Sequence, residues 1–207
     1  MTVKKAQENQ VVIPAINIKK FNLMLVGDSA LICHAWSEKA KKEMLDKQMK
    51  KAKTARQAKN PEQDFYDSLY WLTEKPETPV YDDLFDASFG FPAVAFKSAA
   101  VNACSSVSDI TKVAARGAFH IVGDMVKING VPIMREDMVR VGMGTADLRY
   151  RGEFTSWSAD LEIRYNADLL SLEQIINLFN IAGFAVGIGE WRPQKNGSFG
   201  MFHVGGE

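Results

Sequence analysis

The segment whose residue types are best suited to binding or catalysis is residues 187–200, close to the C-terminal end. It combines four glycines with a tryptophan, an arginine and a lysine. Glycine allows positive φ and close approach of the backbone to a ligand, while cationic and aromatic side chains suit a single nucleic-acid strand. We predict a loop that cradles a phosphate backbone through Gly187, Gly189, Trp191, Arg192, Lys195 and Gly197. The alternative is a turn that needs its glycines only for geometry.

A second anion site is predicted at the start of an alanine-rich helix near residues 92–104. Lys97 and Ser98 stand near its first turn, where unpaired backbone N–H groups and the helix dipole favour negative charge. The same composition also fits a core helix with one exposed lysine.

Three histidines, His34, His120 and His203, are the candidates for acid–base chemistry. His34 follows the first predicted strand and would need to reach a reacting hydroxyl to act as general acid or base. A structural role is the alternative, and no metalloprotease or nucleophile-elbow motif is present. The two cysteines, Cys33 and Cys104, form no CxxC pair. We therefore expect no catalytic residue beyond the weak candidate His34, no metal and no cofactor.

Charge is balanced overall but strongly divided in the first half of the chain. The 25 basic and 25 acidic residues cancel. Residues 39–59 nevertheless hold nine basic and two acidic side chains, and residues 62–86 hold eight acidic and one basic.

After a strand at 21–27, we predict a basic helix from 37 to about 55, a second helix at 61–72 and a loop at 74–88. Residues 29–88 are too long for a plain connection and are interpreted as an insertion. Its basic helix is a solvated surface or lies along nucleic acid.

Residues 118–165 alternate with a period of two, which predicts strands at 119–122, 125–128, 146–154 and 157–165. The hairpin around Gly152 carries Arg151. Between the strand pairs, an arm at 129–145 carries Arg135 and Arg140 among several methionines. The arm either wedges apolar side chains against bases or contributes packing and oligomer contacts.

The order of elements predicts the fold class. A helix opens at Ser171 with a capping box to Gln174, and a last strand follows the glycine-rich loop. Without its insertions the chain reads strand, helix, paired strands, helix, strand. We therefore predict an α+β, ferredoxin-like (RRM-like) βαββαβ core in one domain, residues 21–207, after an N-terminal tail at 1–20.

Three segments together resemble the RAMP superfamily of CRISPR-associated RNA-binding proteins, especially effector backbone subunits. They are the strand end at 25–31, the helix start at 91–99, and the terminal Gly-x-Gly…Lys…Gly-x-Phe-Gly loop. The resemblance implies backbone contacts by Lys97, Ser98 and the loop positions Gly187, Gly189, Lys195, Gly197 and Gly200. The chain departs from the family at Ala95 and Ser98, where serine and glycine are usual. It also resembles proteins carried by phages and prophages.

The expected function is a non-catalytic protein that binds single-stranded RNA or DNA, with RNA favoured, and oligomerises along the strand. The alternatives are a metal-independent endoribonuclease on the same fold and an interaction or inhibitory protein that docks through the charged insertion. The polar N-terminal residues lack the apolar core of a signal peptide. No apolar run is long enough to span a bilayer, so a cytoplasmic location in a bacterial host and no membrane partner are expected.

Overall fold

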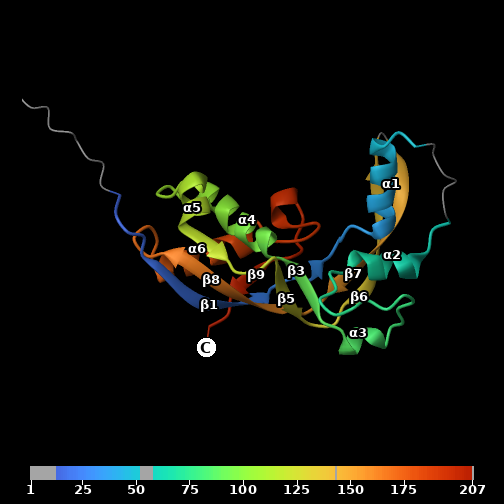
Figure 1. Ribbon diagram of the computed structural model, residues 1–207, viewed down its shortest axis with the longest axis horizontal. Helices are drawn as coiled ribbons and strands as arrows, with labels where there is room; N and C mark the ends of the chain where they lie inside the picture. Colours follow the sequence, from blue (N-terminus) through green and yellow to red (C-terminus); the bar gives the residue numbers. More distant parts are fainter. Residues whose placement is uncertain (1–12, 52–57, 143, 207) are drawn as a thin grey trace, which may run out of the picture.

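The computed structural model describes residues 13–51, 58–142 and 144–206 of the 207-residue chain. It is an α+β structure with two antiparallel sheets, as Figure 1 shows. The strands are β1 (Ile18–Gly27), β2 (Leu31–Ile32), β3 (Phe89–Pro92), β4 (Phe119–Ile121), β5 (Met125–Asn129), β6 (Ile133–Val141), β7 (Thr145–Phe154), β8 (Ser158–Asn166) and β9 (Phe202–Val204). The α-helices are α1 (Glu38–Gln48), α2 (Pro61–Ser68), α3 (Asp83–Asp86), α4 (Ala93–Ala103), α5 (Lys112–Ala118) and α6 (Leu172–Ala185).

The larger sheet is organised around β1 and β8, which pair from Ile18↔Asn166 to Val26↔Ser158. β9 extends the sheet beyond β1. On the other side of β8, β4 pairs near residues 163–165 and β5 pairs at residues 158–159, so these two strands share one position in the sheet. β3 lies beyond β5. In the part of the chain that is described, every pairing in this sheet is antiparallel.

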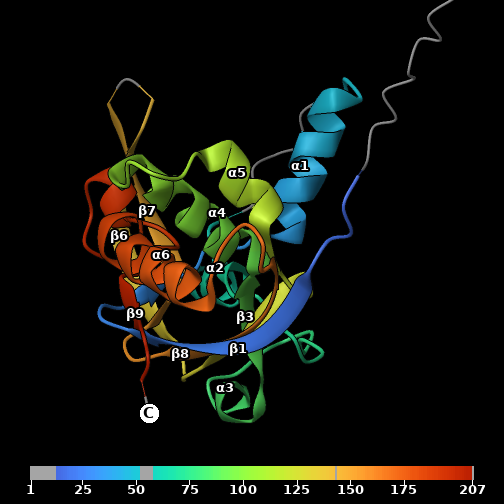
Figure 2. The same ribbon diagram turned by 90° about the vertical axis from the view of Figure 1, so that its left-hand side faces the viewer.

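Helices α4 and α6 cover one face of the larger sheet, as Figures 1 and 2 show. α6 buries an apolar stripe at Ile175, Leu178, Phe179 and Ala182, at the spacing of one helix face. The predicted capping box between Ser171 and Gln174 is present. α6 runs two residues past Gly183, where a β-carbon would lie 1.7 Å from Phe202 O. Glycine at this position therefore lets α6 lie directly against β9.

The smaller sheet has the order β2-β7-β6, and it differs from the sequence prediction. Residues 146–154 do not form a hairpin with the following strand but pair with β6, so the predicted arm is one strand of a long β6–β7 hairpin. On β6 the usual burial of apolar side chains and exposure of polar ones is reversed, because Asp137 is 8% exposed and Met138 is 74% exposed. A strand that buries its acid and exposes its methionine does not show the usual alternation.

The insertion forms a separate group of short elements beside the smaller sheet. α1 is capped by Ser37, whose Oγ accepts from Ala40 N at 3.1 Å. The predicted helix to residue 55 is shorter, and residues 52–57 lie outside the described part. α2 packs against β7, where Gly152 N donates to Ser68 Oγ at 2.7 Å. The predicted loop at 74–88 contains α3.

Two further differences concern the ends of the predicted elements. β3 occupies residues that the sequence assigns to a helix start, so Pro92 is the N-cap of α4. Residues Ile18–Lys20, placed in the predicted tail, belong to β1. Across the described residues, no helix has the length and apolar character needed to cross a membrane.

Candidate nucleic-acid interface

The glycine-rich loop, residues 187–200, is seated on the segment that leads from β1 into β2. Gly200 N donates to Ala30 O at 2.8 Å, and Glu190 N donates to Ile32 O at 3.2 Å. Gly189 and Gly200 have φ of 77° and 65°. β-carbons there would lie 2.6 Å from Ile32 O and 1.8 Å from Ile188 O. These glycines permit both the left-handed turns and the close approach.

The backbone of this loop is largely occupied by its own hydrogen bonds. Nine N–H groups between residues 187 and 200 donate to backbone carbonyls. A phosphate-binding loop instead points several such groups at the ligand. The loop therefore offers side chains, rather than free backbone N–H groups, to a ligand, and it forms one wall of the cavity described next. Gly187, Gly189 and Gly197 set the path of its backbone.

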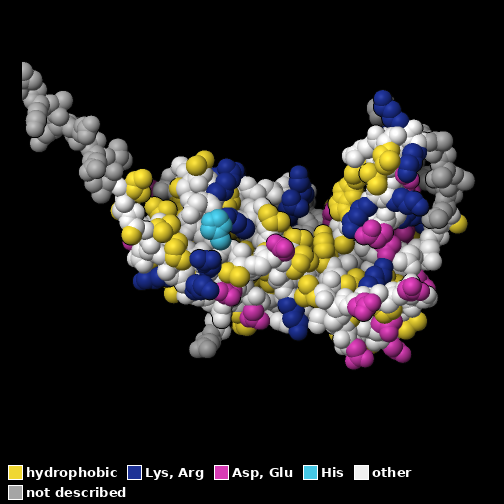
Figure 3. Space-filling model, in the orientation of Figure 1, with side chains coloured by type: hydrophobic (Ala, Val, Ile, Leu, Met, Phe, Trp, Pro, Cys, Tyr) yellow, Lys and Arg dark blue, Asp and Glu magenta, His cyan; other side chains and the backbone are white. Residues whose placement is uncertain are grey.

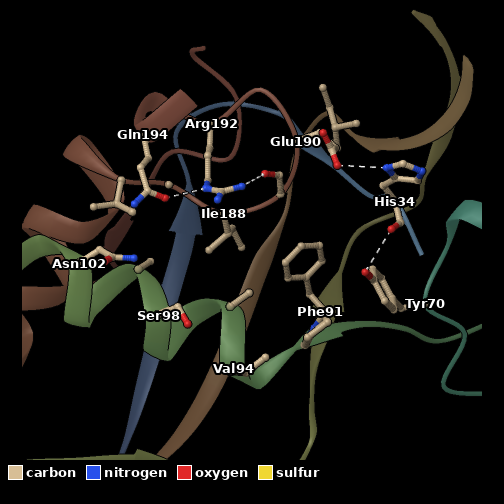
Figure 4. Close-up of a pocket in the computed structure, with 17 residues that line it drawn as sticks. His34, Tyr70, Phe91, Val94, Ser98, Asn102, Ile188, Glu190, Arg192 and Gln194 are labelled. Atoms are coloured by element: carbon tan, nitrogen blue, oxygen red, sulfur yellow. Dashed lines mark hydrogen bonds and ion pairs between the residues drawn. The ribbon is translucent and has the colours of Figure 1, made fainter. Parts of the chain in front are cut away.

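A first cavity of about 310 Å³ lies between this wall and α4. Ser98 and Asn102 line it from α4, facing Arg192 and Gln194 from the loop, as Figure 4 shows. Arg192 Nη1 donates to Gly189 O at 2.9 Å and its Nε donates to Gln194 Oε1 at 3.2 Å. These bonds hold the guanidinium at the cavity wall opposite the helix.

His34 and Glu190 stand at one end of this cavity. His34 Nδ1 lies 3.1 Å from Glu190 Oε1, and Tyr70 Oη donates to His34 O at 3.4 Å (Figure 4). The hydrogen bond from His34 lowers the pKa of the Glu190 carboxyl, with Arg151 and Arg192 adding to the effect. Burial raises the pKa of Tyr70. The imidazole is therefore oriented by a carboxylate, while the Tyr70 phenol holds the backbone carbonyl of His34.

A second cavity of about 600 Å³ shares His34 and Glu190 with the first. Its other cationic and aromatic lining residues are Trp36, Lys59, Arg149, Tyr150 and Arg151. Asp147 accepts from Lys59 at 2.9 Å and from Arg149 at 3.3 Å. These pairs lower the pKa of Asp147, the hydrogen bond from Lys59 contributing most. The two cavities therefore adjoin at His34 and Glu190, and the outline of the molecule dips between the parts that carry α4 and α1 (Figure 3). We call the two adjoining cavities the groove.

Arg151 and Arg135 belong to a buried ion network at the base of the hairpin. Asp137 accepts from Arg135 Nε at 2.8 Å and from Arg151 Nη1 at 3.2 Å. Arg135 also pairs with Glu153 at 3.2 Å, and its guanidinium lies 4.5 Å from the Phe199 ring centroid. Arg151 is 5% exposed, and its Nε has no hydrogen-bond partner among the described atoms. The network joins the hairpin to the glycine-rich loop.

The structure separates other residues that the sequence analysis grouped together. Lys97 points away from the loop, because its Nζ donates to Arg116 O and contacts His120 Nδ1, both at 3.0 Å. Burial lowers the pKa of Lys97. Only Ser98 of the predicted helix-start pair lines the groove. Arg140 is exposed near the hairpin tip, remote along β6 from Arg135.

Trp191 and Lys195 lie on the outer side of the loop. Trp191 has φ of 53° and is 43% exposed, and Lys195 is exposed in the short 3₁₀ turn Pro193–Lys195. Neither lines the two cavities. They can therefore meet a strand only where it leaves the groove.

Sequence reasoning missed Tyr70, Asn102, Arg149, Glu190 and Gln194. Glu190 stands inside the predicted electropositive loop but 156 positions from its partner His34, so only the tertiary fold reveals the pair. Asn102 had a detectable signal, since it follows Ser98 by four positions and therefore shares its helix face. No group of three or more metal-ligating side chains is found within the described ranges.

No protein-family model and no curated protein matches this chain. Among solved structures, the chain is similar to the crystal structure of Cmr6 from Pyrococcus furiosus. The two share 8% sequence identity with a TM-score of 0.41, and the match covers 92% of this chain and 100% of that chain.

Proposed function

We propose that this chain binds single-stranded nucleic acid, RNA in preference to DNA, in the groove between α4, the glycine-rich loop and β7. The observation that carries the proposal is that the two cavities adjoin at His34 and Glu190, which line both. Arg192 and Arg149 place positive charge along the groove, beside the carboxylates of Glu190 and Asp147, and Tyr70 and Tyr150 provide aromatic surfaces. Cationic and aromatic groups along one track are typical of single-strand binding.

The preference for RNA is supported by the neutral polar groups of the groove. Ser98, Asn102 and Gln194 line it with hydroxyl and amide side chains. Such groups can donate to and accept from a 2′-hydroxyl, which is the group that distinguishes RNA from DNA. The motif resemblance to the RAMP superfamily points to the same ligand.

A ferredoxin-like core is part of the proposal. What supports it is the strand order β9, β1, β8 and then β4 with β5, with α4 and α6 as the connecting helices on one face. The insertion and the β6–β7 hairpin then add the second wall of the groove. Assembly of several copies along one strand completes the proposed function.

The test is a fluorescence-anisotropy titration with labelled single-stranded RNA, single-stranded DNA and duplexes of equal length. We expect RNA to bind more tightly than DNA, and single strands more tightly than duplexes. Arg149→Gln removes a groove charge and should weaken binding about tenfold, the scale of one charge-assisted contact. Arg140→Gln is the matched control on the same hairpin and should bind as the wild type does. The groove is refuted as the site if both variants bind as tightly as the wild type and duplexes bind as tightly as single strands.

A second function is favoured by one contact, the His34–Glu190 pair. A carboxylate that orients an imidazole is a frequent arrangement for a general base. Here the base would take the proton of a 2′-hydroxyl of bound RNA, whose oxygen attacks the adjacent phosphorus to form a 2′,3′-cyclic phosphate while the P–O5′ bond breaks and the 5′-oxygen leaves with a proton from water. Labelled RNA incubated with the protein and a chelator tests it. Cleavage that disappears in His34→Ala supports the endoribonuclease, while intact RNA with wild-type protein leaves the non-catalytic binder.

A further inference from the structure

α1 carries an exposed apolar surface. None of its residues is buried. Trp36 just before it is 61% exposed, Leu45 53% and Met44 40%. With Lys41 and Gln48 they line a shallow hollow of about 320 Å³. Exposed apolar surface gathered around a hollow marks a contact with another molecule.

The rim of this hollow is basic. Residues 38–51 hold six lysines and three acidic residues. Two of the acids are engaged locally, since Glu38 pairs with Lys41 at 2.6 Å and Asp46 pairs with Lys51 at 3.0 Å. A partner of this surface should therefore present apolar or aromatic groups surrounded by negative charge.

The segment around α3 has that description. Tyr81 and Phe85 are 49% and 61% exposed, and their rings meet edge to face at 5.8 Å. Leu84 between them is buried and fixes the segment to the fold. Residues 74–86 contain five acidic side chains and one lysine, and that lysine, Lys75, pairs with Asp67. We call Tyr81, Phe85 and their acidic neighbours the α3 knob.

The hollow and the knob lie at opposite ends of the same part of the molecule. Figure 1 places α1 above and α3 below the smaller sheet. Figure 3 shows Lys and Arg side chains with hydrophobic ones near α1, and Asp and Glu side chains with hydrophobic ones near α3. The hollow and the knob are therefore apart in one chain, and a contact between them would join two copies.

We infer that the α1 hollow binds the α3 knob of a second copy of this chain. Pairing α1 with α1 would oppose lysines to lysines, and pairing knob with knob would oppose acids, so the complementary contact is the asymmetric one. An asymmetric contact that does not close builds an open chain of subunits. The inference rests on the proposed function for its biological use, assembly along a strand, but the contact itself is between proteins.

Sedimentation velocity of the wild type at low salt is expected to show oligomers that lengthen with concentration and shorten as salt is added. Two variants each reverse the charge of one of the two surfaces. Lys39→Glu/Lys42→Glu/Lys47→Glu changes the rim of the hollow, and Asp82→Lys/Asp86→Lys changes the knob. Each is expected to be monomeric alone, and an equimolar mixture should reassemble, because each reversed surface then meets its complement.

Matched charge reversals on the larger sheet, Lys19→Glu/Lys127→Glu and Asp124→Lys/Asp160→Lys, should assemble as the wild type does. A wild type that stays monomeric, assembly that stops at a dimer, or a mixture that stays monomeric would each overturn the inference.

Binding to an oligonucleotide that accommodates one copy separates this inference from the proposed function. The knob variant Asp82→Lys/Asp86→Lys, which leaves α1 and the groove residues unchanged, should bind it no more weakly than the wild type. Assembly without nucleic-acid binding would sink the proposed function and leave the α1–α3 contact standing. Nucleic-acid binding by single, unassociated copies on long strands would overturn the α1–α3 contact and leave the groove as the nucleic-acid site.

Discussion

Two sets of aromatic side chains, one on the larger sheet and one beside the smaller sheet, differ sharply in their exposure. On the larger sheet, Phe119, Phe179 and Phe202 are fully buried between strands and helices. Beside the smaller sheet, Trp36 and Phe85 are each 61% exposed and stand among charges of one sign. The first set packs the core of the fold, whereas the second set is the surface on which the proposed contact between copies depends. The groove lies where the parts of the molecule built on the two sheets meet.

The largest expected effect is on stability at Phe179. Phe179→Ala should lower the free energy of unfolding by about 3–5 kcal/mol, since it removes a buried ring and leaves a cavity. Phe85→Ala is the matched change on the α3 knob and should alter stability by no more than about 0.5 kcal/mol. Urea unfolding followed by circular dichroism measures both. Similar losses in the two variants would mean that Phe85 packs inside the folded chain.

The buried ion network should come next. Asp137→Ala leaves Arg135 and Arg151 without their shared carboxylate, which is expected to cost about 3 kcal/mol of stability. Asp160→Ala, on the exposed surface of β8, is the control and should be nearly neutral. If Asp137→Ala is as stable as the control, the network does not hold the hairpin to the loop.

Phe85→Ala should have a clear effect on assembly despite its small effect on stability. Loss of an aromatic group at the centre of a contact is expected to weaken self-association about tenfold or more. The change in concentration dependence in sedimentation velocity measures it, and the control is Phe184→Ala on α6, where the phenylalanine is 74% exposed against 61% for Phe85. Equal weakening in both variants would argue against the α3 knob.

The smallest effect concerns pH and the pair Lys97–His120. Burial lowers the pKa of His120, with Lys97 and Arg164 adding to the effect. Because the folded-state pKa lies below the unfolded value, the unfolded chain binds more protons as pH falls through about 6.5. Stability should therefore decrease on acidification in this window, and less so in His120→Gln. Unfolding curves at pH 7 and pH 5.5 measure the difference, and identical pH dependence would contradict this environment for His120.

The sequence predicted those parts of the fold whose signals are local. The capping box at Ser171 and the period-two strands on either side of 125 depend on neighbouring residues, and both were found. The partner of β7 was not predicted, because β6 buries Asp137 and exposes Met138. Asp137 is held inside by Arg135 on the same strand and by Arg151 across on β7, and a one-dimensional pattern does not contain the second of these contacts.

The candidate site was predicted only in part, for a similar reason. Glycines at 187–200 marked the loop, and Arg192 and Ser98 do line the groove. Lys97 follows Ala93 by four positions and lies on the side of α4 that meets α5 and β4, so its proximity in sequence to Ser98 was misleading. Arg149, Tyr70 and Glu190 come from three distant segments, and only the packing of the insertion against the loop brings them together.

Photo-crosslinking tests the central proposal most directly. Single-stranded RNA containing 4-thiouridine is bound, irradiated and digested, and the crosslinked peptides are identified by mass spectrometry. Binding in the groove predicts crosslinks at its aromatic residues Tyr70 and Tyr150. Crosslinks confined to the strand face of the larger sheet, such as at Met24 or Glu162, would contradict it.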